Sequence, residues 1–153
     1  MVTKVGMQAK FSDSMCDLLE LEYDALEAYK LALTKIHDEK YKDKIKKFSE
    51  DNARHIEEIT DILEFHHVET PKGPDLKQWL TKGKVAISSM IGDQTILAAL
   101  HSNQEDISSA YERIIKRDDV WDDAHDILKY ARSDEKRHNT WLKKTIHSYT
   151  NVS

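Results

Sequence analysis

The sequence predicts an all-α protein in which four long helices form an antiparallel bundle, and three observations support this fold class. Four segments space their apolar residues alternately three and four apart, which is the period of an amphipathic helix. Only two prolines and four glycines occur in 153 residues, too few for the frequent turns of a β-rich fold. Charged residues make up 33% and hydrophobic residues 39%, which suits helices with one solvated face. The length fits a single domain, residues 1–153.

The first two helices are expected from about Asp13 to Ile36 and from about Tyr41 to His66. Ser12 or Asp13 is the expected N-cap of the first helix, because short polar side chains accept hydrogen bonds from the free backbone amides there. The polar break at residues 37–39 is short, so the two helices should form an antiparallel hairpin.

The connection at about residues 67–92 contains both prolines and is long for a link within a bundle. Leu76, Trp79 and Leu80 predict a short helix in it that packs against the bundle. A single long connection between the second and third helices predicts one crossover along the bundle.

The third helix is expected at about residues 94–116, after a cap at Gly92-Asp93 and with a helical lead-in from Val85. A tight turn at residues 117–119 leads to the fourth helix, at about residues 120–148. This second short link predicts a second antiparallel hairpin.

Composition excludes several classes of function. The net charge of −5 argues against nucleic-acid binding, and the Lys42–Lys47 run is expected to coat a solvated helix face, with partner binding as the alternative. No segment approaches the roughly 20 apolar residues of a membrane span, and the N-terminus lacks the apolar run of a signal peptide. We therefore expect a cytoplasmic protein with no membrane partner. The lone Cys16 excludes a disulfide framework and is expected to be a small buried residue within a helix.

Polar residues interrupt the apolar stripe of every predicted helix near its middle. A carboxylate that faces a bundle core is costly unless it is paired, protonated or bound to a metal. These residues lie at similar depth on four facing helices, so they can satisfy one another or a metal ion. They are Glu22 on the first helix, Asn52 and His55 on the second, Gln104 on the third, and Glu135 and His138 on the fourth.

The two predicted hairpins share a pattern. Asp, Ala and Tyr recur at the same offsets in residues 22–29 and 104–111, and Asp, Arg and His recur in residues 51–55 and 134–138. The chain therefore has the character of a duplicated helical hairpin with a pseudo-two-fold axis. That axis places Glu22 opposite Gln104 and Glu135 opposite Asn52.

The spacing of Glu135 and His138 places a carboxylate and an imidazole one turn apart on one helix face, where both can bind one metal. Together with Asn52-x-x-His55 and Glu22-x-x-Ala25-x-x-x-Tyr29, this motif resembles the ligand-bearing helices of ferritins and rubrerythrins. Over most of the chain the sequence is closer to an uncharacterised family of ferritin-like bacterial proteins, most clearly at residues 96–111. The resemblance implies a ferritin-like bundle with a metal site in its core.

Two departures from the rubrerythrin pattern bear on this site. Asn52 and Gln104 stand where that pattern has glutamate, and the loss of negative charge should weaken binding of a second hard cation. The expected cofactor is thus one metal ion (iron, zinc or manganese) in a mononuclear or partial di-metal site, with a weak oxidase, peroxidase or iron-handling role. Asp51 or Glu105 could restore a carboxylate by rotating inward. The expected ligands are Glu22, His55, Glu135 and His138, with Asn52 and Gln104 completing the shell.

A metal-free reading is the alternative. Glu–His pairs and amides can satisfy one another without an ion, and the bundle would then be a scaffold or a partner-binding module, with contacts through Trp79 and the outer helix faces. A homodimer formed through an exposed pair of helices is compatible with the sequence. His66-His67 is expected to be a solvated helix C-terminus, whereas His101 and His125 are expected to lack close carboxylate partners.

Overall fold

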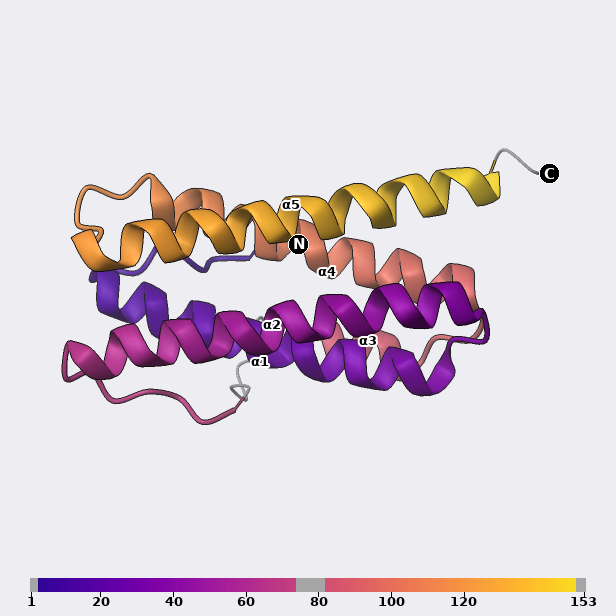
Figure 1. Cartoon of the computed structure of the whole chain (residues 1–153), viewed down its shortest axis with the longest axis horizontal. Coiled ribbons are helices and arrows are strands. Elements are labelled where there is room, and N and C mark those ends of the chain that lie inside the picture. Colours follow the sequence, from indigo (N-terminus) through magenta and orange to yellow (C-terminus); the bar gives the residue numbers. More distant parts are fainter. Residues whose placement is uncertain (1–2, 74–81, 151–153) are drawn as a thin grey trace.

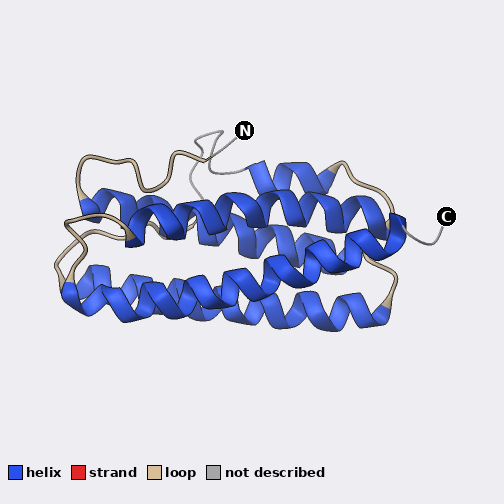
Figure 2. Ribbon diagram, turned by 90° about the horizontal axis from the view of Figure 1, so that it is seen from above, coloured by secondary structure: helices blue, strands red, loops and turns tan. Residues whose placement is uncertain are grey.

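The computed structural model describes residues 3–73 and 82–150 of the chain. Every regular element in these two stretches is a helix, as the sequence predicts. The four long helices lie side by side as a bundle in two perpendicular views, and α1 also contacts α3 (Figures 1 and 2). The helices are α1 (Phe11–Lys35), α2 (Glu39–Phe65), α3 (Lys82–Ser88), α4 (Asp93–Ile115) and α5 (Asp122–Thr150).

The two N-terminal helices begin earlier than the sequence suggested. α1 begins at Phe11, and Lys10 occupies the N-cap position without a side-chain hydrogen bond, so the prediction of Ser12 or Asp13 was wrong. α2 begins at Glu39 because the Asp38 side chain accepts hydrogen bonds from the backbone amides of residues 40 and 41. Part of the expected polar break is therefore the first turn of α2.

Polar contacts fasten the α1–α2 link to the start of α4. Asp93, the first residue of α4, accepts hydrogen bonds from the backbone amides of His37 and Asp38, at 2.8 and 3.0 Å. Gly92 precedes it with a φ of 91°, a left-handed conformation that favours glycine. The expected cap at Gly92-Asp93 is thus present, with Asp93 already inside the helix.

Helix α3 occupies the end of the connection between α2 and α4. It includes Val85 but ends at Ser88, so the expected lead-in is a separate short helix. Leu76, Trp79 and Leu80, which predicted a helix in this connection, lie outside the described residues. The Lys35 ammonium donates to three carbonyls at and just beyond the end of α3, those of residues 87, 88 and 90, at 2.9–3.1 Å. These hydrogen bonds tie α3 to the end of α1.

The start of α3 packs very closely on α1 and α4. Asp24 of α1 accepts hydrogen bonds from the backbone amides of Gly83 and Lys84, at 2.9 and 3.4 Å, and burial raises the pKa of this carboxyl to about 6. A Cβ added to Gly83 would lie 2.7 Å from the Asp24 carboxylate and 2.9 Å from the Asn103 side chain. Only glycine allows this approach without a shift of backbone or side chains.

Gly83→Ala is therefore expected to lower the free energy of unfolding by about 1–3 kcal/mol, because the new methyl group overpacks the contact between α3 and α1. Urea denaturation measures this change. Gly73→Ala is the matched control, since nothing lies within 4 Å of the Cβ it would add. Equal stability of the two variants would contradict the close packing at Gly83.

Two hydrophobic clusters fill the bundle, and a polar layer separates them. One cluster contains Phe11, Leu63 and Leu128, whereas the other contains Phe48 and Leu142. In α2, α4 and α5 the buried members of the two clusters leave gaps at residues 49–58, 101–106 and 132–141, which contain the inward polar residues, although Ile56 and Trp141 within these gaps also pack against the clusters. The apolar layers on both sides keep water from this polar layer, so charges within it interact strongly.

Candidate metal centre

The structure buries every polar side chain that was expected to interrupt the apolar stripes. Each of them exposes at most 1% of its surface, and together they come from all four long helices. Burial of two carboxylates and two imidazoles in one layer requires compensation by hydrogen bonds, opposite charge or an ion. The six residues are Glu22, Asn52, His55, Gln104, Glu135 and His138.

His55 lies between the two buried carboxylates. Its Nδ1 atom is 3.1 Å from an oxygen of Glu135 and 3.6 Å from an oxygen of Glu22. One potential ligand atom from each of these three residues lies within 4.8 Å of the other two, an arrangement that could hold a metal ion. His138 approaches the same cluster, with its Nδ1 atom 3.6 Å from the second oxygen of Glu135.

The two amides hydrogen-bond to the two carboxylates. Asn52 donates to Glu22, so this bond joins α2 to α1, and Gln104 donates to Glu135, which joins α4 to α5. The sequence repeat, which relates Glu22 to Gln104 and Asn52 to Glu135, maps one of these two bonds onto the other. Each amide thus reaches the acid on the helix next to it in the chain.

Two buried tyrosines add further hydrogen bonds to the same cluster. The Tyr111 hydroxyl donates to Glu22 at 2.8 Å, and the Tyr29 hydroxyl donates to the Gln104 oxygen at 2.7 Å. Burial, together with the charges of Glu22 and Glu135, raises the pKa of both tyrosines well above its ordinary value. Both hydroxyls therefore remain protonated donors.

The outer nitrogen of each site histidine contacts an aspartate on the other helix. His55 Nε2 of α2 lies 2.9 Å from Asp134 of α5, and His138 Nε2 of α5 lies 2.8 Å from Asp51 of α2. Such a carboxylate orients the imidazole and directs its Nδ1 atom inward, toward the buried acids. Asp51 is thus a partner of His138 on the outer side, and the idea that it rotates inward was wrong.

Two arginines hydrogen-bond to these two aspartates on the outer side of the histidines. Arg137 donates to Asp51 and Asp134 at 2.8 and 2.9 Å, and Arg54 donates to the same two carboxylates. Burial acts to raise the pKa of Asp51, but hydrogen bonds from His138 and Arg137 outweigh it and lower that pKa. The sequence repeat had revealed the recurrence of Asp, Arg and His, but not that the aspartates support the histidines of the opposite helix.

Four buried atoms of the cluster have no hydrogen-bond partner: Asn52 Oδ1, His55 Nδ1, Glu135 Oε1 and His138 Nδ1. Each of them can offer a lone pair to a metal ion, which displaces any proton on a histidine Nδ1 atom when it binds, and each belongs to a residue that the sequence proposed as a ligand. Other buried side-chain atoms in the described residues also lack a hydrogen-bond partner, but these four lie together in one buried cluster, and such a group of atoms calls for an explanation.

The ionisation of the cluster follows from its geometry. Burial, and after it the neighbouring Glu135, raises the pKa of Glu22. Burial disfavours the charged form of His55, but the neighbouring carboxylates of Glu22 and Glu135 outweigh it and raise its pKa to about 11 in the metal-free protein. Burial also opposes ionisation of Glu135, yet His138 and His55 lower its pKa overall. Positive charge between the two acids is therefore what stabilises this layer.

Other residues singled out in the sequence lie elsewhere. His101 Nε2 lies 3.2 Å from Glu105, so the expectation that His101 lacks a carboxylate partner was wrong, and Glu105 is an exposed residue that does not turn inward. His66 stacks on Trp121 with ring centroids 3.8 Å apart and pairs with Asp123 at 2.8 Å. It is thus a packed residue at the end of α2 and not merely a solvated one.

Cys16 lies within α1, as predicted, but is only half-buried. Its thiol donates weakly to the Glu69 carbonyl at 3.7 Å. Burial and three neighbouring acids raise its pKa to about 11, which disfavours the reactive thiolate.

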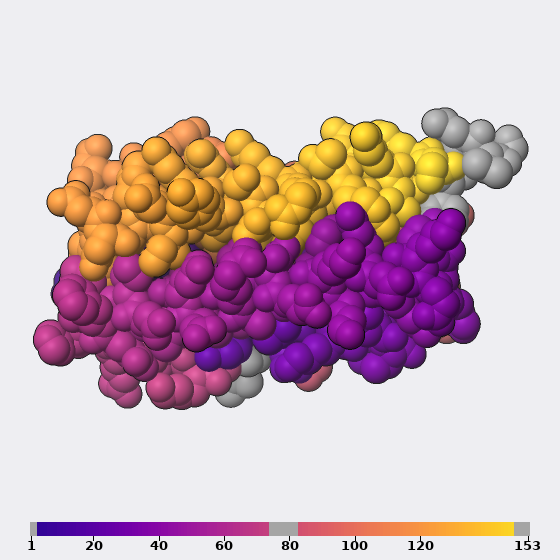
Figure 3. Space-filling model, viewed as in Figure 1, coloured from indigo at the N-terminus to yellow at the C-terminus, as the bar shows by residue number. Residues whose placement is uncertain are grey.

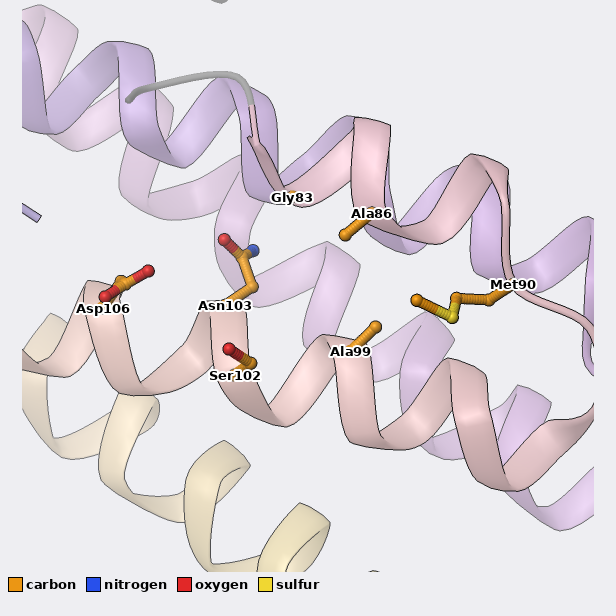
Figure 4. Close-up of a pocket in the computed structure, with 7 residues that line it drawn as sticks. All are labelled: Gly83, Ala86, Met90, Ala99, Ser102, Asn103 and Asp106. Carbon is orange, nitrogen blue, oxygen red and sulfur yellow. The ribbon is translucent and has the colours of Figure 1, made fainter. Parts of the chain in front are cut away.

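A separate cleft of about 320 Å³ lies between α3 and α4 (Figure 4). Ala86, Met90 and Ala99 form its apolar part, and the Asn103 side chain points toward Gly83 at its other end. Its lining contains none of the six buried site residues, so the cleft and the polar cluster are different features of the bundle.

Comparison with known families matches residues 10–117 to a family described as "Domain of unknown function (DUF2383)". The match covers 108 of the 153 residues. The chain belongs to this family. The DUF2383 region spans α1 to α4, so it contains Glu22, Asn52, His55 and Gln104, whereas α5 supplies Glu135 and His138 from outside it.

No curated protein and no solved structure matches the chain. In the described residues 3–73 and 82–150, no helix combines the length and the apolar character that a membrane span requires.

Proposed function

We propose that this DUF2383 protein binds a metal ion in the polar layer of its bundle. The four unpaired lone-pair donors carry this proposal, because all four belong to one buried cluster that already contains two carboxylates. A divalent cation would satisfy these atoms and compensate the charge of both acids at once.

Glu22, His55 and Glu135 are the proposed primary ligands, and His138 and Asn52 are close enough in the cluster to contribute. Carboxylate, imidazole and amide oxygen form a mixed donor set that suits iron, manganese or zinc. Gln104 donates to Glu135 and would orient this carboxylate. A bound iron or manganese ion would add one-electron chemistry, and a weak redox or iron-handling role belongs to the proposal for those two metals.

We also propose that the helices are arranged as in ferritin-like proteins. Short links between α1 and α2 and between α4 and α5, with a long connection from α2 to α4, support a ferritin-like, antiparallel four-helix domain with one crossover. The proposed ligands then come from α1, α2 and α5 at one level of the bundle, and α4 contributes Gln104, which orients one of them. Ferritins and rubrerythrins, which the motifs resemble, likewise hold their metals between the long helices of a bundle.

A metal-free hydrogen-bonded network is the second candidate, and specific contacts favour it. Asn52 and Tyr111 donate to Glu22, and His55 lies 3.1 Å from Glu135, so a protonated His55 compensates much of the buried charge without an ion. In that case the bundle is a scaffold or a partner-binding module. Added metal would then leave its stability unchanged.

Metal content after reconstitution distinguishes the two candidates. Protein stripped with a chelator, loaded with Fe²⁺ under anaerobic conditions, Mn²⁺ or Zn²⁺, and desalted is expected to retain about one ion per chain of at least one of these metals. Glu22→Gln/Glu135→Gln is expected to lose this ion, because it removes both anionic ligands from the cluster. Inductively coupled plasma mass spectrometry measures the metal content.

The matched control is Glu50→Gln/Glu57→Gln, which removes the same charge from exposed positions of α2. It should retain the metal content of the wild type. If the wild type retains no ion, or if both double variants lose it equally, the polar layer is not the site, and the metal-free network becomes the better account.

A further inference from the structure

Basic and acidic residues are segregated along α2 and α5. Residues 39–48 of α2 contain five lysines and two acids, and residues 136–148 of α5 contain three lysines, one arginine and no Asp or Glu. These two segments thus carry a formal charge of +7 in a chain whose net charge is −5. The remaining residues of both helices, 49–65 and 122–135, contain most of their acids.

The fold brings the two basic segments together. α2 and α5 contact each other, and the seam between them runs along one face of the molecule (Figure 3). A groove of about 430 Å³ opens on this seam. Its lining contains four cations, one hydroxyl and one indole, and no acid: Lys44, Lys136, Arg137, Thr140, Trp141 and Lys144.

The cations of this groove differ in how far they are compensated. Lys136 lies 3.4 Å from Glu112 of α4, and Arg137 donates to Asp51 and Asp134. Among the described residues, Lys44 and Lys144 have no ion-pair partner. Both of them line the groove, one from each helix, so an anion bound there would meet two ammonium groups that no acid compensates.

The indole that lines the groove packs on other aromatic rings. Trp141 is half-buried and makes edge contacts with Tyr41 and Phe48, at centroid distances of 5.9 and 5.6 Å. Phe48 in turn stacks on His138 of the polar layer, with centroids 4.1 Å apart. An aromatic side chain beside several cations suits a ligand that carries negative charge on a small organic body.

We propose that this groove binds a compact, multivalent oxyanion, with phosphate or carboxylate groups between Lys44 and Lys144. Its size favours a small molecule, since about 430 Å³ accommodates a few oxyanion groups but not an extended polymer. Phosphate and carboxylate oxygens are the usual partners of lysine ammonium groups. The proposal does not require a metal in the polar layer, although Arg137 and Phe48 contact residues of that layer.

Isothermal titration of the full chain with pyrophosphate, and separately with citrate, tests this proposal at low ionic strength. We expect saturable one-to-one binding of at least one of the two anions, weakened as salt is added. The tighter of the two identifies phosphate or carboxylate as the preferred group. Lys44→Gln/Lys144→Gln should bind at least ten-fold more weakly, because it removes the two uncompensated cations.

Lys30→Gln/Lys129→Gln is the matched control, since it removes the same charge from exposed positions of α1 and α5 outside the groove. It should bind as the wild type does, and circular dichroism should show equal helix content in all three proteins. Absence of saturable binding, or equal weakening in both double variants, would overturn the proposal. Far tighter binding of a 20-nucleotide single-stranded DNA would also overturn it, because an extended basic surface and not the groove would then be the site.

Discussion

Replacing Asn52 and Gln104 by glutamate is expected to raise the retained metal from about one ion per chain to two. Both amides already contact the buried carboxylates, so glutamates there would place two more anionic groups in the same layer, Gln104→Glu with the same shape and Asn52→Glu with one methylene more. Four carboxylates and two histidines supply the charge and the ligands that a pair of divalent cations needs. Metal content and calorimetric stoichiometry measure the result.

The same variant should be much less stable than the wild type when no metal is present. Asn52 and Gln104 lose their donor groups on substitution, and the new carboxylates add like charge to a layer that excludes water. We expect a loss of several kcal/mol in the free energy of unfolding, recovered on addition of metal because a ligand that binds the native state stabilises it.

Gln94→Glu/Ser133→Glu is the control, because it adds two carboxylates at exposed positions. It should leave both the stoichiometry and the stability of the metal-free protein close to those of the wild type. A stoichiometry of one in Asn52→Glu/Gln104→Glu would show that the amides are not what limits the number of ions.

His55→Ala is expected to be the most damaging single substitution in the metal-free protein. His55 is the cationic group between Glu22 and Glu135, and its removal leaves two buried carboxylates facing one another. Removing one partner from a buried ion pair typically costs about 3–5 kcal/mol. Urea denaturation of the chelator-treated variant measures this loss, and metal retention should be lost as well.

His125→Ala serves as its control, because His125 lies on α5 in neither the polar layer nor its outer ring of aspartates and arginines. Its free energy of unfolding should stay within about 1 kcal/mol of the wild type. A loss of less than about 1 kcal/mol in His55→Ala would mean that His55 does not compensate the two acids.

Helix periodicity was sufficient to find the buried polar layer. Glu22, Gln104 and Glu135 each interrupt an otherwise apolar stripe, and such an interruption can be read from one helix at a time. The same reasoning found the all-helical class, because few glycines and prolines punctuate the chain.

Contacts between helices could not be predicted from the periodicity of single helices. The pairing of Asp51 with His138 and of Asp134 with His55 depends on how α2 and α5 are rotated and shifted relative to each other. Sequence repetition therefore pointed to these aspartates without revealing that each of them serves the opposite helix.

The predicted start of the first helix was wrong for a local reason. α1 begins after Lys10, whose side chain makes no capping hydrogen bond, so no capping residue marks the boundary. Packing of Phe11 into the hydrophobic cluster offers a reason for the early start. Tertiary contacts of this kind decide where a helix begins when the local sequence has no strong signal.

Anomalous diffraction from crystals of the metal-loaded protein tests the central claim most directly. The proposal predicts a single strong peak within the bundle, about 2.0–2.3 Å from oxygens of Glu22 and Glu135 and from Nδ1 of His55. No such peak, or peaks only at surface groups such as His66 and Asp123, would contradict it and leave a bundle whose polar layer is stabilised by its own hydrogen bonds and charges.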